Sequence, residues 1–537
     1  MKNETGMLLK FFTFFLIAFI PVLQAQVTQE WIATYNGPLN FDDFSRTVTT
    51  DINGNVIVAG TTGTASLFDI LTLKYSPSGV LLWSAAYDGG IDLFDEGTSA
   101  KADIYGNIYV TGSLDALTSF ELIVLLKYGS AGNLIWSRTY SGYFPRNVAV
   151  DLEIDSRGNV ICLGSGIGPF FYYDFVVLKY DTSGNLLWSA TSECELGGWA
   201  YDLTVDSRNN IYATGYLNRS GSFSDFGTIK YDTLGVKQWV AYYNGPGDSA
   251  DVAVSVDVDE IGNVYVTGQC MDSNFVRQMT TVKYNSSGSL LWAETYPAVA
   301  SPSQVKAWRD NTVYVSGSVL TDSSGYDYLL INYDTAGNMI WTFTNNGTAN
   351  SNDGIARMEV DADGDIYLTG SCINAGTGSD FVTLKLDASG AVIWTKVCSG
   401  QQTDDGAAGM TIDENGSLYV TGSSGSPSDV MIVKYSQLTS VSNTGSSGDM
   451  QFALSQNYPN PFNASTMMTF QIRMKGHYSL DVYDLRGVLV RKLFSRDFES
   501  GTYEVNNDFS SLPSGVYLYR LSSGKDQAES RKFLLIK

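Results

Sequence analysis

Histidine, lysine and arginine are scarce in this chain of 537 residues, and their scarcity excludes several classes of function. His477 is the single histidine, so imidazole general bases and histidine-ligated metals are excluded from nearly the whole chain. The 33 basic residues face 56 acidic ones, which gives a formal net charge of −23. Because contacts with phosphates need lysine and arginine, we expect no nucleic-acid partner.

Long apolar runs are also missing, with one exception near the N-terminus. Lys2 and Lys10 precede an apolar run at residues 11–23, which at about 13 residues is too short to span a bilayer. This pattern is typical of a signal peptide, which we place at residues 1–25. The sequence therefore predicts a mature chain that is exported to the periplasm and has no transmembrane segment.

Cysteine is sparse, and its spacing does not match that of metal sites. An odd number of cysteines cannot all pair within one chain. We expect most of them to be packed or free thiols, and one pair, Cys372 with Cys398, merits a test because both lie in the same repeat region. The five are Cys162, Cys194, Cys270, Cys372 and Cys398.

Tryptophan recurs at regular intervals through the middle of the chain. Successive gaps are 52, 53, 52, 51, 53, 49 and 53 residues, and between them the same pattern returns: an apolar alternation ending in Asp, a turn, a strand ending in Gly, a variable loop, and a strand ending in Lys-Tyr. Each unit therefore holds four short strands joined by turns. The repeating tryptophans are Trp31, Trp83, Trp136, Trp188, Trp239, Trp292, Trp341 and Trp394.

Four strands in every unit of about 52 residues is the pattern of a β-propeller blade. We predict an all-β chain, with an eight-bladed β-propeller of four-stranded blades at residues 26–436 and a small C-terminal β-sandwich after it. The repeats start with a tryptophan strand at residues 30–35 and end without one. We therefore expect the N-terminal strand to complete the last blade and close the ring.

The Asp-x-x-Gly-Asn sequences predict turns that contain a left-handed residue. Asn209 takes the place of the glycine in one unit, and asparagine tolerates that conformation. Asp361, Asp363 and Asp365 look like the opening of a calcium loop, but Cys372 stands where a bidentate glutamate belongs. We expect no metal and no cofactor, with calcium as the alternative left open.

The repeat resembles a family of bacterial proteins, those with seven-bladed-propeller-type (SBBP) repeats. The likeness covers about residues 27–437 and is carried by the Asp-x-x-Gly-Asn-Val-Tyr-Val-Thr-Gly pattern, as at residues 259–268. This chain departs from the family in having eight units. Its sixth unit has lost part of a turn at residues 310–314, which we connect with the short gap of 49.

A Ser-, Thr- and Gly-rich stretch at residues 437–450 predicts a flexible linker, and short alternating strands follow at 451–537. This last segment resembles the type A C-terminal sorting domain of proteins exported by the type IX secretion system of Bacteroidetes. The resemblance implies contact with the type IX machinery and a secreted or outer-membrane-surface location. Residues that carry it include Asn457, Tyr458, Pro459, Asn460, Pro461, Phe462, Asn463, Gly487 and Gly515.

The even gaps between repeats leave no room for the long loops that propeller enzymes generally carry. Paired carboxylates could still hydrolyse a glycoside, so a carboxylate-based glycan-active enzyme remains an alternative. We expect instead a binding or adhesion module for an extracellular glycan or protein. A structural component of the cell surface is the second alternative.

Aromatic residues gather in three variable loops that share one face of the expected ring. Exposed aromatic rings suit stacking on sugars or anchoring a protein, so these loops predict a ligand site. The alternative is that the rings pack over the blades as a local cap. The predicted site comprises Tyr143, Phe144, Phe170, Phe171, Tyr172, Tyr173 and Trp199.

Overall fold

A computed structural model describes residues 27–437 and 452–537, except 66, 91–93, 116–120, 195, 310–311, 323, 401–404, 458, 485–488 and 524–526. The expected signal peptide and nearly all of the expected linker lie outside these residues, as do Tyr458 and Gly487. Contacts divide the chain into two compact units, Met1–Leu438 and Thr439–Lys537. Every regular element in the described residues is a β-strand, and none is a helix that could cross a membrane.

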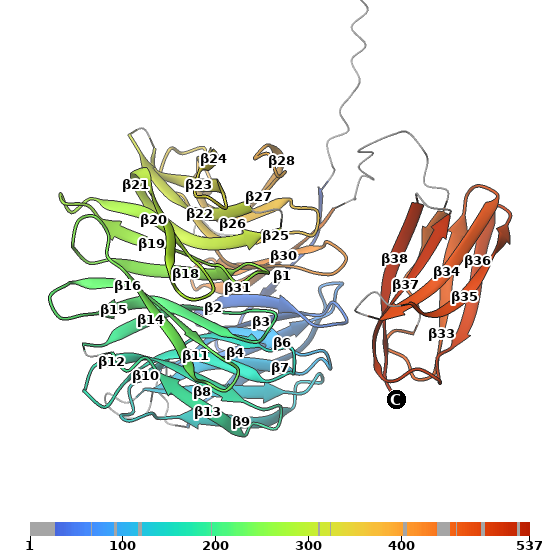
Figure 1. Ribbon diagram of the computed structural model, residues 1–537, viewed down its shortest axis with the longest axis horizontal. Helices are drawn as coiled ribbons and strands as arrows, with labels where there is room; N and C mark the ends of the chain where they lie inside the picture. Colours follow the sequence, from blue (N-terminus) through green and yellow to red (C-terminus); the bar gives the residue numbers. More distant parts are fainter. Residues whose placement is uncertain are drawn as a thin grey trace, which may run out of the picture. The chain divides into compact units, whose positions relative to one another are not determined.

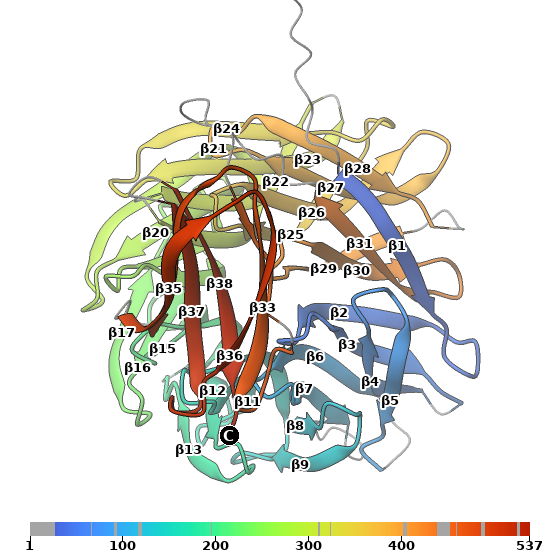
Figure 2. The same cartoon turned by 90° about the vertical axis from the view of Figure 1, so that its right-hand side faces the viewer.

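The first unit is a ring of antiparallel blades (Figures 1 and 2). The first four blades, each listed from its inner to its outer strand, are β2 (Asp43–Thr50), β3 (Val56–Gly63), β4 (Phe68–Tyr75) and β5 (Leu81–Tyr87); β6 (Asp95–Ala102), β7 (Ile108–Asp115), β8 (Glu121–Tyr128) and β9 (Leu134–Tyr140); β10 (Asn147–Ile154), β11 (Val160–Ile167), β12 (Tyr173–Tyr180) and β13 (Leu186–Thr191); and β14 (Gly198–Val205), β15 (Ile211–Asn218), β16 (Ser224–Tyr231) and β17 (Lys237–Tyr243).

The remaining blades complete the eight counted among the described residues. They are β18 (Val252–Val258), β19 (Val264–Met271), β20 (Arg277–Tyr284) and the first part of β21 (Leu290–Trp308); the rest of β21 with β22 (Thr312–Thr321), β23 (Gly325–Asp334) and β24 (Met339–Asn345); β25 (Gly354–Val360), β26 (Ile366–Asn374), β27 (Gly378–Leu386) and β28 (Val392–Cys398); and β29 (Asp405–Ile412), β30 (Leu418–Ser424), β31 (Asp429–Gln437) and β1 (Val27–Tyr35).

Burial along each blade follows the apolar pattern of its strands. All eight residues of β3 are buried, because the middle strands are covered by neighbouring blades on both faces. The outer strand β5 alternates between exposed and half-buried positions. Each blade is too thin to bury both faces by itself, so stacking around the ring supplies the core.

The ring closes where the two ends of the repeat region meet. Strand β1 pairs antiparallel with β31, from Val27 opposite Gln437 to Tyr35 opposite Val430. Figure 2 shows the blue β1 strand beside the orange β31 strand. The prediction of an eight-bladed propeller with an N-terminal closing strand is confirmed.

The fifth and sixth blades share one long strand. β21 serves as the outer strand of one blade and, without a loop, continues as the inner strand of the next. From the sequence, we attributed the short gap of 49 residues to a turn partly lost at residues 310–314. The short gap also reflects the lack of a loop between Trp292 and Ala300, because the chain there stays in one strand.

Each repeating tryptophan but the last lies against a turn of the following blade. The Trp239 indole N–H donates to the Ser286 carbonyl at 3.1 Å, and its ring lies under Gly288. Trp31, at the start of the ring, does the same with Pro77 and Gly79. The tryptophan spacing therefore marks contacts between blades, which is why it is so regular.

This contact predicts a large cost for a methyl group at Gly288. The backbone there has φ +83°, and a Cβ would lie 2.7 Å from Trp239 Cδ2. Gly416 has a similar φ of +77° but no atom within 4 Å of an added Cβ, so Gly416→Ala is the matched control. We expect Gly416→Ala to lose about 1–2 kcal/mol from its left-handed backbone, and Gly288→Ala to lose roughly 1–3 kcal/mol more from overpacking. Urea unfolding measures both, and equal losses would contradict the contact.

The turn between the first two strands of a blade is held by its aspartate. Asn209 has φ +63°, so asparagine does take the left-handed place of the glycine. Asp361 Oδ1 accepts the backbone N–H groups of Asp363 and Asp365, and Lys385 Nζ lies 2.7 Å from Asp365 Oδ2. Of the three carboxylates that resemble a calcium loop, that of Asp361 is thus engaged by its own turn and that of Asp365 by a lysine.

All five cysteines are buried free thiols, as the sequence predicts for most of them. The pair singled out for testing, Cys372 with Cys398, is not formed. Cys372 lies on β26 and Cys398 on β28, and β27 runs between these strands. Two inter-strand spacings, about 9.5 Å, exceed the reach of a disulfide.

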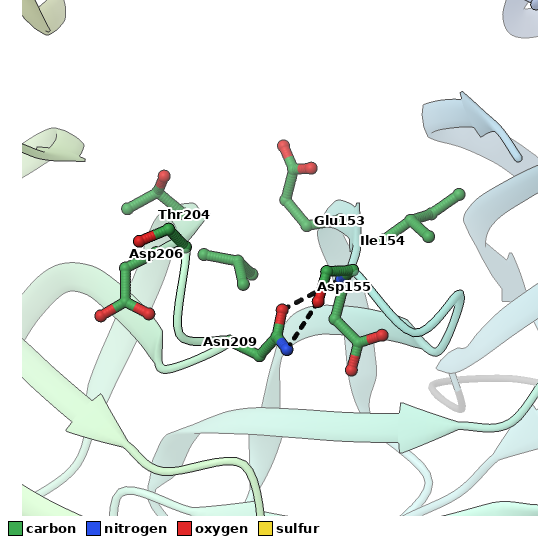
Figure 3. Close-up of a pocket in the computed structure, with 9 residues that line it drawn as sticks. Glu153, Ile154, Asp155, Thr204, Asp206 and Asn209 are labelled. Atoms are coloured by element: carbon green, nitrogen blue, oxygen red, sulfur yellow. Dashed lines mark hydrogen bonds between the residues drawn. The ribbon is translucent and has the colours of Figure 1, made fainter. Parts of the chain in front are cut away.

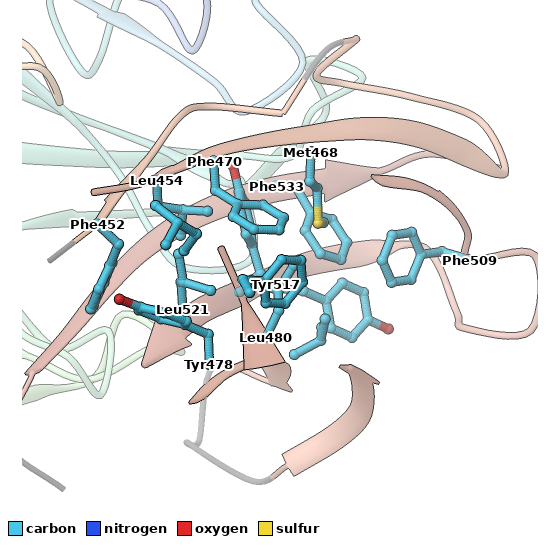
Figure 4. Packing of buried hydrophobic residues seen from close by; sticks show 14 of the residues in the cluster. Phe452, Leu454, Met468, Phe470, Tyr478, Leu480, Phe509, Tyr517, Leu521 and Phe533 are labelled. Carbon is cyan, nitrogen blue, oxygen red and sulfur yellow. The ribbon is translucent and has the colours of Figure 1, made fainter. Parts of the chain in front are cut away.

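The second unit is a two-sheet sandwich. One sheet has the order β32 (Phe452–Leu454), β33 (Ser465–Ile472), β36 (Gly501–Asp508); the other has β35 (Leu489–Phe498), β34 (Gly476–Asp484), β37 (Gly515–Ser523), β38 (Gln527–Leu535). Buried aromatic residues fill the space between them (Figure 4). Phe470 of the first sheet lies 5.3 Å from Phe494 of the second, centroid to centroid. The predicted C-terminal β-sandwich is confirmed.

Candidate functional site

The predicted aromatic residues lie on the face of the ring that carries the longer loops. In each blade the connection from second to third strand and the connection to the next blade leave the sheet at the same end. Residues 141–146, 168–172 and 192–197, except 195, form three such connections on neighbouring blades. The structure therefore places Tyr143, Phe144 and residues 170–172 on adjacent loops, whereas Tyr173 begins β12 and Trp199 lies near the start of β14.

Phe171 is held in an unusual conformation at the tip of its loop. The Gly168 N–H donates to the Tyr172 carbonyl at 2.8 Å, and the Phe171 N–H donates to the Gly168 carbonyl at 3.1 Å. This tight turn gives Phe171 φ +65°, a region that bulky residues rarely adopt. The ring is 73% exposed, so the strained backbone presents an aromatic side chain to solvent.

The predicted site combines exposed rings with half-buried ones. Tyr143, Phe170 and Tyr172 are exposed like Phe171, whereas Phe144 is half-buried. The rings of Phe144 and Phe171 lie 4.7 Å apart between centroids, so Phe144 supports Phe171 from below.

Tyr173 and Trp199 form a second pair, with ring centroids 4.9 Å apart, and both are half-buried. Burial raises the pKa of the Tyr173 hydroxyl, and the nearby Glu121 carboxylate raises it further. Burial also raises the pKa of Glu121. These two rings are packed between blades and have less free surface than the first pair.

Two further exposed phenylalanines were not among the predicted residues. Phe223 is 63% and Phe275 is 74% exposed, and both lie in the same connection as Phe171 on the next two blades. Phe275 even shares the left-handed backbone, with φ +61°. The three phenylalanines are spaced 52 residues apart in the sequence, so the repeat period itself was the signal that could have found them.

A pocket of about 370 Å³ lies on the opposite face, between the turns of two blades (Figure 3). Asn209 bridges the turns: its Oδ1 accepts the Ser156 N–H at 3.0 Å and its Nδ2 donates to Ser156 Oγ at 2.9 Å. Burial opposes ionisation of Asp155 in its wall, but hydrogen bonds from Lys179 and Asn159 lower its pKa overall. The polar groups of the wall are thus engaged in holding turns.

The innermost strands carry a layer of charged residues around the axis of the ring. Lys101 pairs with Glu153 at 2.7 Å, and Lys306 lies 3.6 Å from Glu359. Asp202 forms no ion pair with a lysine among the residues that the structure describes; burial first, then the charge of a neighbouring aspartate, raises its pKa to about 7. This layer ties adjacent blades together, since Asp202 Oδ2 accepts the N–H of Val256 from the next blade.

The sorting-motif residues in the described chain have structural roles in the sandwich. Asn457 is buried and donates to Thr466 Oγ1 at 2.9 Å and to the Pro459 carbonyl at 3.0 Å. Asn460 Oδ1 accepts the N–H of Leu534. Phe462 packs in the core against the ring of Phe533. Pro461 and Asn463 flank Phe462, and Gly515 begins β37.

Comparison with known families identifies the C-terminal domain. The model described as "Secretion system C-terminal sorting domain" matches residues 456–537. The resemblance to a sorting domain is thereby confirmed for this part of the chain. A domain of this kind directs its protein through the type IX system to the cell surface or the extracellular space.

One curated protein matches part of this chain at low identity. An uncharacterized WD repeat-containing protein of Acanthamoeba polyphaga mimivirus is 24% identical; the match covers 28% of this chain and 14% of that protein. The chain thus spans about one seventh of this curated relative.

Several solved structures are similar at low identity. They include the WD40 domain of SCAP from fission yeast (10% identity, TM-score 0.42, 76% of this chain and 98% of that chain) and a protein of unknown function from Dyadobacter fermentans (12%, 0.37, 76% and 99%). A fungal alcohol oxidase in complex with copper is 11% identical, with TM-score 0.40, covering 95% and 99%.

Proposed function

We propose that the propeller is an extracellular binding or adhesion module, carried out of the cell by its sorting domain, and that its ligand is a glycan or a protein. The observation that supports this most is the set of exposed aromatic rings on one face, led by Phe171, Phe223 and Phe275 on successive blades. Loops usually expose polar residues, so repeated large apolar rings indicate a surface that binds something.

The geometry of Phe171 favours a binding role over chance exposure. A bulky residue at φ +65° costs free energy, and nothing is gained from it if the ring only faces water. Flat aromatic faces beside hydroxyl groups such as those of Tyr143 and Tyr172 suit the faces of sugar rings. A glycan is therefore our first choice of ligand.

Two alternatives stay open beside this proposal. The half-buried pair Tyr173 and Trp199 favours a structural role, in which the loops cap the blades of a surface scaffold. A carboxylate-based glycan-active enzyme would need two carboxyl groups at a set separation near the ligand. We assign no catalytic step to the propeller. This assignment can be tested by incubating the protein with any glycan that it binds and assaying for released sugars.

We expect Tyr143→Ala with Phe171→Ala to weaken ligand binding by roughly tenfold or more, with the thermal midpoint nearly unchanged. The reason is that both rings are mostly exposed, 65% and 73%, so their removal takes away contact surface but little core. A glycan array and a pull-down with the mature protein identify the ligand, and titration calorimetry then measures affinity.

The matched control is Tyr105→Ala, which removes an equally exposed ring (70%) from the opposite face and should leave affinity unchanged. Equal affinity of the double variant and the unmodified protein would reject the site. A marked loss of stability in the double variant without loss of affinity would favour the capping role.

A further inference from the structure

Phe171 and Phe275 occupy a backbone position that this chain otherwise gives to glycine or asparagine. The Asp272 N–H donates to the Val276 carbonyl at 3.0 Å, and the Phe275 N–H donates to the Asp272 carbonyl at 3.0 Å, as in the turn of Phe171. Among the described residues, every other turn with this pair of hydrogen bonds has a left-handed glycine at this place, apart from Asn209. Two turns therefore keep a bulky ring where glycine would be free of strain.

Large exposed apolar side chains recur in the equivalent connection of three consecutive blades. The three connections join the second and third strands and are residues 168–172, 219–223 and 272–276. Their last residues, Tyr172, Phe223 and Val276, are all exposed. In the sixth, seventh and eighth blades, the described residues of this connection are aspartate, serine, alanine, glycine, threonine and proline. The rings therefore follow an arc over three blades, which we call the aromatic arc.

The spacing of the blades sets the size of a ligand that uses the whole aromatic arc. Packed sheets lie about 10 Å apart, so the connections leave adjacent blades at about that separation or more. A monosaccharide has one ring and covers one aromatic side chain at most. A chain of linked sugars has an apolar face at each unit, so one chain can stack on the rings of all three blades.

Polar residues separate the rings within the aromatic arc. Ser220, Ser273 and Asn274 are exposed in the same connections as the phenylalanines. A protein interface has a continuous apolar core inside a polar rim. A sugar chain instead alternates apolar ring faces with hydroxyl groups, and these match isolated aromatic rings with hydrogen-bonding groups between them. The arrangement therefore favours a polysaccharide over a protein.

The charges around the aromatic arc favour a neutral ligand. Arg219 Nε donates to Asp225 Oδ2 at 2.8 Å, so this guanidinium is already paired with a carboxylate. Arg277 is exposed, but Glu193 and Asp248 expose the opposite charge in connections to neighbouring blades. The formal net charge of the chain, −23, repels polysaccharides that carry acidic groups.

We infer that the aromatic arc binds one neutral polysaccharide chain, which stacks sugar faces on Phe171, Phe223 and Phe275 together. This inference rests on the proposed binding function of the same face and deepens it, because it makes the ligand a polymer and not a single sugar. One chain links the three contacts, so each contact raises the effective concentration of sugar at the next. Short fragments that reach one blade bind weakly.

The test uses the full mature protein and four neutral polysaccharides as probes: a glucan, a xylan, a mannan and a galactan. Titration calorimetry compares each polymer with its monosaccharide and with a fragment of six linked sugars. We expect at least one polymer to bind, and its six-sugar fragment to bind about 100-fold or more tightly than its monosaccharide. Phe223→Ala and Phe275→Ala should each weaken binding of that fragment by roughly tenfold.

The matched control is Phe41→Ala. Phe41 is also an exposed phenylalanine (47%) on this face, but it lies in the connection into the first blade, outside the aromatic arc. This variant should bind the fragment like the unmodified protein. A second variant, Phe275→Gly, separates binding from folding: glycine relieves the left-handed backbone, so the thermal midpoint should not fall although the affinity does.

The inference is wrong if none of the four polymers binds. It is also wrong if the monosaccharide binds as tightly as the six-sugar fragment, or if Phe223→Ala and Phe275→Ala leave the affinity unchanged. In these last two cases the proposed binding function still stands if Tyr143→Ala with Phe171→Ala weakens binding. Failure of the extended site is thereby distinguished from failure of the whole face.

Discussion

A chain that begins at residue 37 is expected to unfold at least about 5 °C below one that begins at residue 27. The shorter chain lacks β1, which pairs with β31 along its whole length. Its loss exposes the edge of β31 and removes Trp31, whose indole N–H bonds the Pro77 carbonyl of the next blade. It also removes Glu30, which lies 2.7 Å from Lys434.

Differential scanning calorimetry of the two chains measures this difference. A synthetic peptide of residues 27–36, added in excess to the shorter chain, should restore part of the lost midpoint because it can add back as the missing strand. A peptide with the same composition in scrambled order serves as the control. Identical midpoints for the two chains would mean that β1 does not close the ring.

The second large effect concerns export. In a host with the type IX system, a chain that ends at Gly448 should remain in the periplasm, while the full-length chain reaches the surface or the medium. The missing segment contains the whole sorting domain, which matches at residues 456–537 and has its own aromatic core. Fractionation and immunoblotting measure the distribution between compartments.

A reporter protein fused to residues 437–537 provides the reciprocal control and should be exported. The variant Phe470→Ala within the full-length chain should also reduce export, because it removes a buried ring that joins the two sheets of the sandwich. Equal secretion of the chains with and without the sorting domain would refute its role.

The sequence by itself determined those features that each repeat encodes locally. The tryptophan period gave the number of blades. The ring closure followed because the repeats begin with a tryptophan strand and end without one, so the last blade lacks a fourth strand unless the strand at Trp31 completes it. Asn209 could be assigned to a left-handed turn because few residues tolerate that backbone. The sorting domain was recognised from its residues in order.

Only the tertiary structure decided which residues of neighbouring blades contact one another. Trp239 and Gly288 belong to different units, and nothing in either repeat shows that the indole of one lies against the turn of the other. The missing loop after Trp292 could be placed only once β21 was seen to run through two blades. Phe171 was predicted from composition, but its exposure depends on how its turn packs against the neighbouring loop. Local sequence encodes strands and turns, whereas the burial and charge environment of a side chain is set by residues about fifty positions away, through the stacking of one blade on the next.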